Sequence, residues 1–300
     1  MQTYTKINTL YKRFQSLGKV ELPKKDWIRF QNVIKPGDYA NPVFELLNNS
    51  DTLLECYSKI DGTNSKIAYF PSTGKIMVGG KTDKASSQSG QFEFLQKIAD
   101  RILPALKEMY PPECAKFAPK GDGSNNIYYY SSFDSEEPFV MKAGKAVVEL
   151  EEVPVYIYGE YYGKGIQKCG ARYRDDNDFV VFDIQQQGWW LPKEMRDSIC
   201  QKLDLHQVPF IGYLTLEQAE EMVTKGFPTR EKAKDPTLIE EGIVARPKIP
   251  FKDEKGNRVI VKLKHCDYVK WKNAFAAGTQ EDYFDFVKWY DENEESIKNQ

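Results

Sequence analysis

The sequence contains the run Lys59-Ile60-Asp61-Gly62-Thr63-Asn64, and the segments on both sides of it have the pattern of strands. Residues 53–58 are of strand length and lead into the run, and residues 65–70 alternate polar and apolar side chains after it. A turn at residues 71–74 precedes a third strand at residues 75–79. We therefore predict three successive strands, with the run connecting the first two.

The remaining segments have patterns typical of helices and strands. Apolar residues at helical spacing over residues 92–110 predict an amphipathic helix that Pro104 can kink. Thr215 and Gln218 have capping-box spacing ahead of a helix that Gly226 ends. The other expected elements are strands at 153–159, 179–184, 242–246 and 258–263, helices at 193–203 and 215–225, an exposed loop or hairpin at 119–137, and helical structure from 268 onward. This pattern predicts an α+β fold with antiparallel sheets and flanking helices.

The composition indicates a folded chain with little net charge. The 300 residues include 13% aromatic side chains, and the formal net charge is −2. A nucleic-acid partner would therefore need a local basic patch. Apolar runs fall short of the ~20 residues that cross a bilayer, and the N-terminus lacks a signal-peptide core. The five cysteines include no C-x-x-C pair, which favours a reducing compartment, and we expect the cytoplasm.

The polar residues beside the expected strands limit the chemistry. The sequence has only two histidines, His206 and His265, and they are not in metal-ligand spacing. With so few histidines, a Ser-His-Asp or Cys-His mechanism is disfavoured. Lysines and glutamates predominate instead. Cations stabilise spread negative charge and carboxylates hold divalent metals, which suits phosphoryl or nucleotidyl transfer.

Five segments also occur in a recognisable order. They are 59–64, 159–167 (Gly-Glu-Tyr-Tyr-Gly-Lys-Gly-Ile-Gln), 179–184 (Phe-Val-Val-Phe-Asp-Ile), 241–244 (Glu-Gly-Ile-Val) and 261–264 (Val-Lys-Leu-Lys). This order resembles the covalent nucleotidyltransferases, the superfamily of ATP-dependent ligases and messenger-RNA capping enzymes. The ending Gly165-Ile166-Gln167 is similar to that of the nick-sealing RNA ligases of the phage and trypanosome-editing type. The resemblance covers residues 53–265 and implies the adenylylation-domain fold of these ligases.

The resemblance implies an ATP-dependent RNA ligase with a covalent intermediate. Lys59 would attack the α-phosphate of ATP and form lysyl-AMP. The AMP would pass to an RNA 5′-phosphate, and a 3′-hydroxyl would attack that end to seal the strand. Lys262 and Lys264 would contact the α-phosphate and promote the transfer.

The other matched positions have implied roles in binding metal, nucleotide and RNA. Glu160 and Glu241 are expected to hold Mg2+ or Mn2+, and Glu160 also suits the ribose hydroxyls. Phe182 is expected to stack on adenine. Asn64 and Gln167 match residues used around the nucleotide and the RNA end. The full set expected at the nucleotide is Asp61, Gly62, Asn64, Lys81, Glu160, Phe182, Glu241, Lys262 and Lys264.

One motif departs from the family pattern. The family usually has an arginine after a lysine between the first and third motifs, whereas this chain has Gly79-Gly80-Lys81-Thr82. Lys81 would have to substitute for the arginine, and it lacks the two-pronged fork that an arginine offers a phosphate.

The resemblance also implies a division of the chain and leaves alternatives open. Residues 1–50 are expected to pack on an adenylylation domain at 51–265, and residues 266–300 to form a short helical element. The tail after Lys264 is too short for an oligonucleotide-binding barrel, which favours an RNA ligase. A DNA ligase, a GTP-using capping-type enzyme and a non-catalytic nucleic-acid-binding relative stay open.

The expected partner is RNA with 5′-phosphate and 3′-hydroxyl ends, nicked or single-stranded, with an end-healing enzyme as a further candidate and no membrane. Basic segments that contain or adjoin aromatic residues could contact its phosphates and bases. They lie at residues 11–14, 142–145, 164–174 and 270–272.

Overall fold

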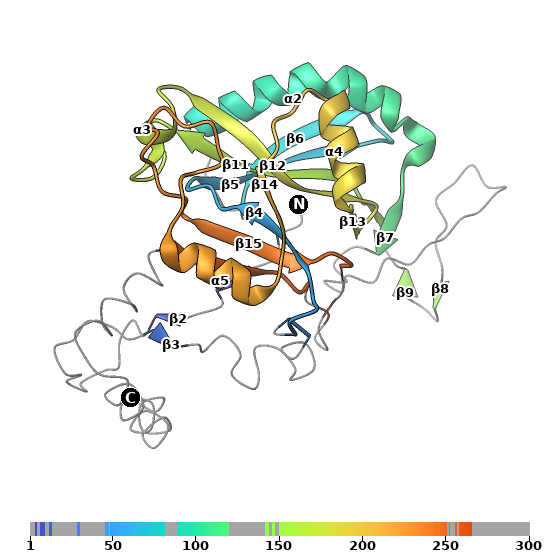
Figure 1. Cartoon of the computed structure of the whole chain (residues 1–300). Coiled ribbons are helices and arrows are strands. Elements are labelled where there is room, and N and C mark those ends of the chain that lie inside the picture. Colours follow the sequence, from blue (N-terminus) through green and yellow to red (C-terminus); the bar gives the residue numbers. More distant parts are fainter. Residues whose placement is uncertain are drawn as a thin grey trace, which may run out of the picture. The chain divides into compact units, whose positions relative to one another are not determined.

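The computed structural model contains two compact units, each with its own five-stranded sheet (Figure 1). Unit 1 comprises Met1–Tyr4 and Asp61–Val208, and unit 2 comprises Thr5–Ile60 and Pro209–Gln300. The structure describes residues 4, 7–9, 12–13, 29–30, 46–47, 49–81, 89–119, 142–143, 146–147, 150–250, 252, 256 and 258–265.

The sheet of unit 1 is antiparallel throughout. Its strand order is β13 (Trp189–Trp190), β12 (Asn177–Gln186), β11 (Val155–Gly163), β5 (Thr63–Phe70) and β6 (Lys75–Gly80). A register shift between Tyr158 and Gly159 interrupts the pairing of β11 with β12.

The two faces of this sheet differ in chemistry. One face carries Ile67 and Tyr69 and buries a hydrophobic core against α2 (Ser89–Met109) and α4 (Lys193–Lys202), the helices seen over the sheet in Figure 1. Because side chains alternate along a strand, Asn64 and Lys66 project from the opposite face. That second face therefore carries Asn64, the last residue of the run 59–64, and Lys66.

Shorter elements complete unit 1. They are the 3-10 helix η1 (Pro112–Cys114), the antiparallel pair β7 (Phe117–Pro119) and β10 (Leu150–Glu152), the pair β8 (Lys142–Ala143) and β9 (Ala146–Val147), and α3 (Gly170–Tyr173).

The sheet of unit 2 has the order β1 (Asn8–Thr9), β16 (Val261–Lys264), β15 (Gly242–Pro247), β4 (Leu54–Ser58) and β14 (Phe210–Leu214). Its neighbours pair antiparallel, apart from the parallel pair of β1 and β16. Helix α5 (Leu216–Lys225) packs on the face that carries Leu54, Cys56, Ile243 and Ala245. A separate antiparallel pair joins β2 (Lys12–Arg13) to β3 (Arg29–Phe30).

The structure confirms the predicted fold class and most predicted elements. The capping box of Thr215 and Gln218 is present, and Gly226 ends α5 at a φ of 74°, which favours glycine. Helix α2 continues through Pro104. The strand predicted from residue 258 begins only at Val261, and Arg258 makes an isolated bridge to Lys252. The sequence analysis did not predict β13 or β14.

Some predictions fall outside the described residues. These are the helical element at 266–300, the basic residues 270–272, residues 11, 14, 144 and 145 of two other basic segments and, apart from Pro119 in β7, the loop at 119–137. The packing of residues 1–50 on an adenylylation domain at 51–265 stays a prediction. Among the helices that the structure describes, no helix has the length and apolar character needed to span a membrane.

Candidate active site

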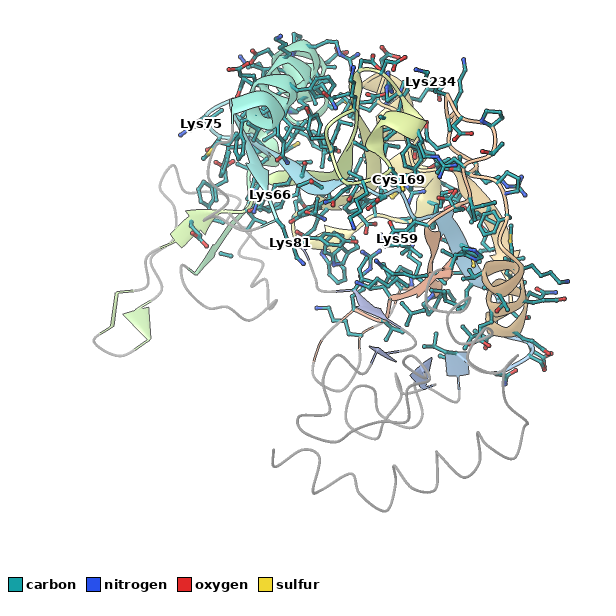
Figure 2. The ribbon with its side chains drawn as sticks, turned by 90° about the vertical axis from the view of Figure 1, so that its left-hand side faces the viewer. Lys59, Lys66, Lys75, Lys81, Cys169 and Lys234 are labelled. Carbon is teal, nitrogen blue, oxygen red and sulfur yellow. The ribbon has the colours of Figure 1, made fainter. Side chains whose placement is uncertain are left out.

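Lys59 lies directly after β4, in a position where the sheet of unit 2 still holds the backbone. Its backbone N–H donates to the carbonyl of Gly242 at 3.0 Å, which extends the pairing of β4 with β15 beyond Ser58. Its side-chain Nζ donates to Oε2 of Glu241 at 2.5 Å. Lys59, labelled in Figure 2, therefore has a fixed backbone, and Glu241 is its carboxylate partner.

The same carboxylate contacts a second lysine. Nζ of Lys264 lies 2.8 Å from Oε1 of Glu241, so the two oxygens of one glutamate join Lys59 and Lys264. The side chains of Lys59, Glu241 and Lys264 are 20%, 18% and 31% exposed, so the group is partly shielded from water. Two ammonium groups and one carboxylate leave a net positive charge, which attracts a phosphate.

Lys262 lies on the same face of the sheet as this group. Val261 and Leu263 belong to the core of unit 2, and the alternation along β16 directs Lys262 and Lys264 away from that core. Lys262 pairs with Val244 in the ladder. The structure thus brings together Lys59, Glu241 and Lys264, and it places Lys262 two residues earlier on the same strand.

In unit 1, Asn64 on β5 lies directly opposite Glu160 on β11. The two side chains project from one face of the sheet, because residues paired across antiparallel strands share a face. Oδ1 of Asn64 is buried and has no hydrogen-bond partner within the described part of the chain. A carbonyl oxygen beside a carboxylate forms a pair of hard oxygen donors, which suits a hydroxyl group or a divalent cation.

Gly62 is required by the close approach of β11. A Cβ atom at this position would lie 2.5 Å from the carbonyl oxygen of Tyr161 and 2.7 Å from Cγ of Glu160. The carbonyl oxygen of Gly62 accepts a hydrogen bond from Nε2 of Gln167 at 3.1 Å. Gln167 has a φ of 55°, in the left-handed region. Gly62 of segment 59–64 and Gln167 at the end of segment 159–167 are therefore in direct contact.

Phe182 is half-buried and held from two sides in unit 1. Its carbonyl oxygen accepts a hydrogen bond from Nη1 of the buried Arg196 at 3.2 Å. Its ring meets the ring of Tyr4 edge-on, with 5.0 Å between centroids. The hydroxyl of Tyr4 donates to Oδ2 of Asp183 at 2.5 Å. The residue expected to stack on adenine thus has a fixed backbone and a fixed aromatic neighbour.

Tyr4, Lys66 and Arg196 were not identified from the sequence. The signal for Lys66 was present, because it lies two residues after Asn64 in a strand and so shares its face. Lys66 is 1% exposed, whereas Lys81, the expected substitute for the motif arginine, is exposed just after β6 (Figure 2). For Tyr4 and Arg196 no local pattern in the sequence indicates their contacts with Phe182 and Asp183 of segment 179–184.

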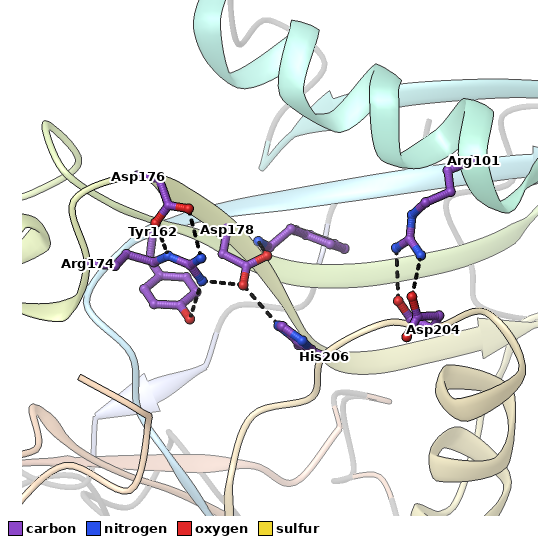
Figure 3. A network of polar contacts seen from close by, with 8 residues as sticks. Arg101, Tyr162, Arg174, Asp176, Asp178, Asp204 and His206 are labelled. Carbon is purple, nitrogen blue, oxygen red and sulfur yellow. Dashed lines mark hydrogen bonds and ion pairs between the residues drawn. The ribbon is translucent and has the colours of Figure 1, made fainter. Parts of the chain in front are cut away.

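Arg174, in one of the basic segments, forms hydrogen bonds with two carboxylates (Figure 3). Its Nε donates to Oδ1 of Asp176 at 2.6 Å, and its Nη1 donates to Asp178, which also contacts Nδ1 of His206 at 2.9 Å. The hydrogen bond to Asp176 raises the pKa of Arg174 above its ordinary value. This guanidinium links the segment after β11 to the start of β12 and has fewer donors left for a phosphate than an unpaired arginine would have.

Unit 2 thus contains a cationic group made by Lys59, Glu241 and Lys264, and unit 1 contains a pair of oxygen donors on Asn64 and Glu160. A family model described as RNA ligase matches residues 54–264, and the chain belongs to this family.

Solved structures with similarity include two variants of the RNA ligase of Naegleria gruberi. One, with ATP and Mn, has 15% identity and a TM-score of 0.48 over 91% of this chain and 65% of that chain. The other, with AMP and Mn, has 16% identity and a TM-score of 0.47 over 88% and 62%. An archaeal ATP-dependent RNA ligase has 13% identity and a TM-score of 0.43 over 76% and 46%. The chain thus spans less than two thirds of the length of these proteins. A comparison with curated proteins gave no match.

Proposed function

We propose that this protein is an ATP-dependent RNA ligase in which Lys59 carries the nucleotide. Membership of the RNA ligase family supports the proposal, and the observation that carries it is the carboxylate of Glu241 between the amines of Lys59 and Lys264. A lysine that is partly shielded, held by its backbone and surrounded by charged groups is suited to attack a phosphate.

The proposed first step forms one bond and breaks one. The lone pair of Nζ of Lys59 attacks the α-phosphorus of ATP, the bond from that phosphorus to the bridging oxygen breaks, and pyrophosphate leaves. Nζ must give up a proton to attack, and Glu241 Oε2 is the acceptor already within hydrogen-bond distance. Lys264 and Lys262 supply positive charge for the phosphate oxygens.

The oxygen donors of Glu241, Glu160 and Asn64 are of the type that binds a divalent metal. In the described residues no three His, Cys, Asp or Glu side chains form a metal cluster, so Mg2+ or Mn2+ would share one or two carboxylates with nucleotide phosphates. The candidate carboxylates are Glu241 in unit 2 and Glu160 in unit 1, and within unit 1 the carbonyl oxygen of Asn64 is a hard donor on the same face as Glu160. When bound, such a metal neutralises charge on the phosphates.

The residues of unit 1 are proposed to bind the nucleoside and the RNA end. Glu160 accepts hydrogen bonds from the ribose hydroxyls, and Phe182 stacks on the adenine. Asn64 and Gln167 contact the RNA end, a role supported by the contact of Gln167 with Gly62. Lys81 stays a candidate for an outer phosphate, because it is exposed.

The later steps transfer AMP to a 5′-phosphate of RNA and join that end to a 3′-hydroxyl with release of AMP. The proposal includes action in the cytoplasm, which the free thiols of Cys56, Cys114, Cys169 and Cys200 support. An enzyme that prepares 5′-phosphate and 3′-hydroxyl ends is the corresponding candidate partner.

A ligation assay tests the proposal. The protein is incubated with Mg2+, ATP or GTP, and nicked or single strands of RNA or DNA that carry 5′-phosphate and 3′-hydroxyl ends. We expect joined RNA with ATP. Joining of DNA alone, or with GTP alone, would support the DNA ligase or the capping-type alternative, and RNA binding without any joining would support a non-catalytic relative.

A further inference from the structure

A row of aromatic and cationic side chains crosses the sheet of unit 2, on the face away from its core. The guanidinium carbon of Arg246 lies 4.9 Å from the centroid of Tyr57, whose ring lies 5.3 Å from that of Phe210. Phe210 meets Tyr213 edge-on at 5.1 Å, and Nζ of Lys248 lies 5.2 Å from the centroid of Tyr213. We call these five residues the aromatic row.

The inner end of the row is rigid. Arg246 and Tyr57 are buried, and both hold the carboxylate of Glu55: Nε of Arg246 lies 3.1 Å and the hydroxyl of Tyr57 lies 2.9 Å from Oε2. Lys59 follows Tyr57 by two residues, and its backbone pairing with Gly242 continues the extended chain just past the end of β4, so the two side chains share a face about 7 Å apart. The row therefore begins beside the proposed nucleophile.

The outer end of the row is presented to solvent on the edge strand β14. Phe210 and Tyr213 are each 36% exposed, and Lys248 is exposed. The core of unit 2 lies on the other face of the sheet, around Cys56 and Ile243. These rings are thus left at the surface although their burial would stabilise the fold.

A strand irregularity brings the two exposed rings together. In a regular strand, residues three apart project from opposite faces. The pairing of β14 with β4 shifts register between Phe210 and Gly212, and Gly212 has a φ of 154°, a conformation that L side chains rarely adopt. The shift allows Phe210 and Tyr213 to meet, and such bulges often redirect side chains beside functional sites.

We propose that the aromatic row binds unpaired bases of the RNA substrate next to the end that reacts at Lys59. This inference rests on the proposed function and adds to it that the substrate has a single-stranded stretch. Aromatic faces stack on unstacked bases of any sequence, and a cation beside them attracts the phosphates between those bases. The bases of a duplex are already stacked on each other, so they do not fit such a row.

Leucine and ring-retaining variants separate stacking from packing. Phe210→Leu and Tyr213→Leu keep apolar bulk and lose the ring, whereas Phe210→Tyr and Tyr213→Phe keep a ring. We expect the leucine variants to bind a single-stranded RNA oligonucleotide roughly 5- to 100-fold more weakly, and the ring-retaining variants to bind it like wild type. Trp189→Ala is the matched control, because Trp189 is an aromatic residue of unit 1 with 64% exposure.

Lys248→Ala tests the electrostatic part of the row. Loss of one phosphate contact should lower the slope of log affinity against log salt by about 0.7 for a single strand. An unchanged slope would remove Lys248 from the site.

Photocrosslinking of the wild-type protein keeps the inference testable even if a variant fails to fold. A single-stranded RNA that contains 4-thiouridine near its 5′-phosphate is irradiated with the protein, and the modified peptides are sequenced. We expect crosslinks within β14. Crosslinks only elsewhere, or leucine variants that melt and bind RNA like wild type, would overturn the inference. A wild type that crosslinks at β14 but joins no RNA would instead count against the proposed function alone.

Discussion

Nζ of Lys59 lies 2.5 Å from Oε2 of Glu241, although 182 residues separate the two in the chain. The contact exists because Lys59 extends β4 and Glu241 directly precedes β15, and these strands pair antiparallel. The register of one strand pair thus sets the geometry of the proposed nucleophile.

Replacing Glu241 with glutamine should strongly reduce transfer of AMP to the protein. The amide keeps the shape of the carboxylate but removes the negative charge shared by Lys59 and Lys264. We expect a fall of about 100-fold in the rate of labelling by α-labelled ATP. Glu221→Gln, which breaks an exposed pair with Lys225 in the same unit, should label like wild type. Equal rates for both variants would contradict the role of Glu241.

Adding a methyl group at Gly62 should damage both stability and labelling. The new Cβ would lie 2.5 Å from the carbonyl oxygen of Tyr161, so β11 has to shift. We expect Gly62→Ala to lower the free energy of unfolding by about 1–3 kcal/mol in urea titrations.

The matched control for this variant is Gly90→Ala. Gly90 lies in α2 and has nothing within 4 Å of an added Cβ. This substitution should stabilise the protein by about 0.5–1 kcal/mol. A Gly62→Ala variant as stable and as active as Gly90→Ala would show that the close approach is unimportant.

Two substitutions at Tyr4 separate its hydroxyl from its ring. Tyr4→Phe removes the hydrogen bond to the buried Asp183 and should cost about 1–3 kcal/mol of stability. Tyr4→Ala also removes the ring beside Phe182, so it should raise the KM for ATP in the labelling reaction. Measurement of KM and kcat for both variants decides the point. A wild-type KM in Tyr4→Ala would exclude a role for the ring in positioning Phe182.

The cysteines report on both units through their reactivity. Burial raises the pKa of Cys56 and that of Cys200 to about 12, whereas Cys114 and Cys169 are partly exposed. Alkylation requires the thiolate, so at pH 8 iodoacetamide should modify Cys114 and Cys169 in the native protein, and Cys56 and Cys200 only after unfolding. Peptide mapping by mass spectrometry checks this pattern, and rapid native modification of Cys56 would contradict it.

The same raised pKa values predict how stability depends on pH. Between the ordinary thiol value of 9.0 and about 12, the folded state keeps protons that the unfolded chain releases. The free energy of unfolding should therefore fall as pH rises through this window. Replacing both cysteines with alanine should flatten that part of the profile.

Local patterns in the sequence predicted many of the helices and strands. Alternation located β5 and helical spacing located α2, because these patterns reflect burial of one face, and the capping-box spacing with Gly226 located α5. The ordered motifs singled out Lys59, Glu241 and Lys264, and the structure joins these three residues through the carboxylate of Glu241.

The contacts made by single residues could not be predicted in this way. Tyr4 stands in a polar segment without periodicity, yet it packs against Phe182 and Asp183. Arg196 belongs to a helix, where its sequence position does not reveal that its side chain is buried. The register shift that joins Phe210 to Tyr213 depends on how β14 pairs with β4, which local sequence does not determine.

The most direct measurement is covalent labelling of the protein by α-labelled ATP in the presence of Mg2+, followed by denaturing electrophoresis and mapping of the modified peptide. The account predicts that the wild type is labelled, that the label is on Lys59, and that Lys59→Ala takes up none while it melts like wild type. An unlabelled wild type, or a Lys59→Ala variant that is labelled normally, would contradict it.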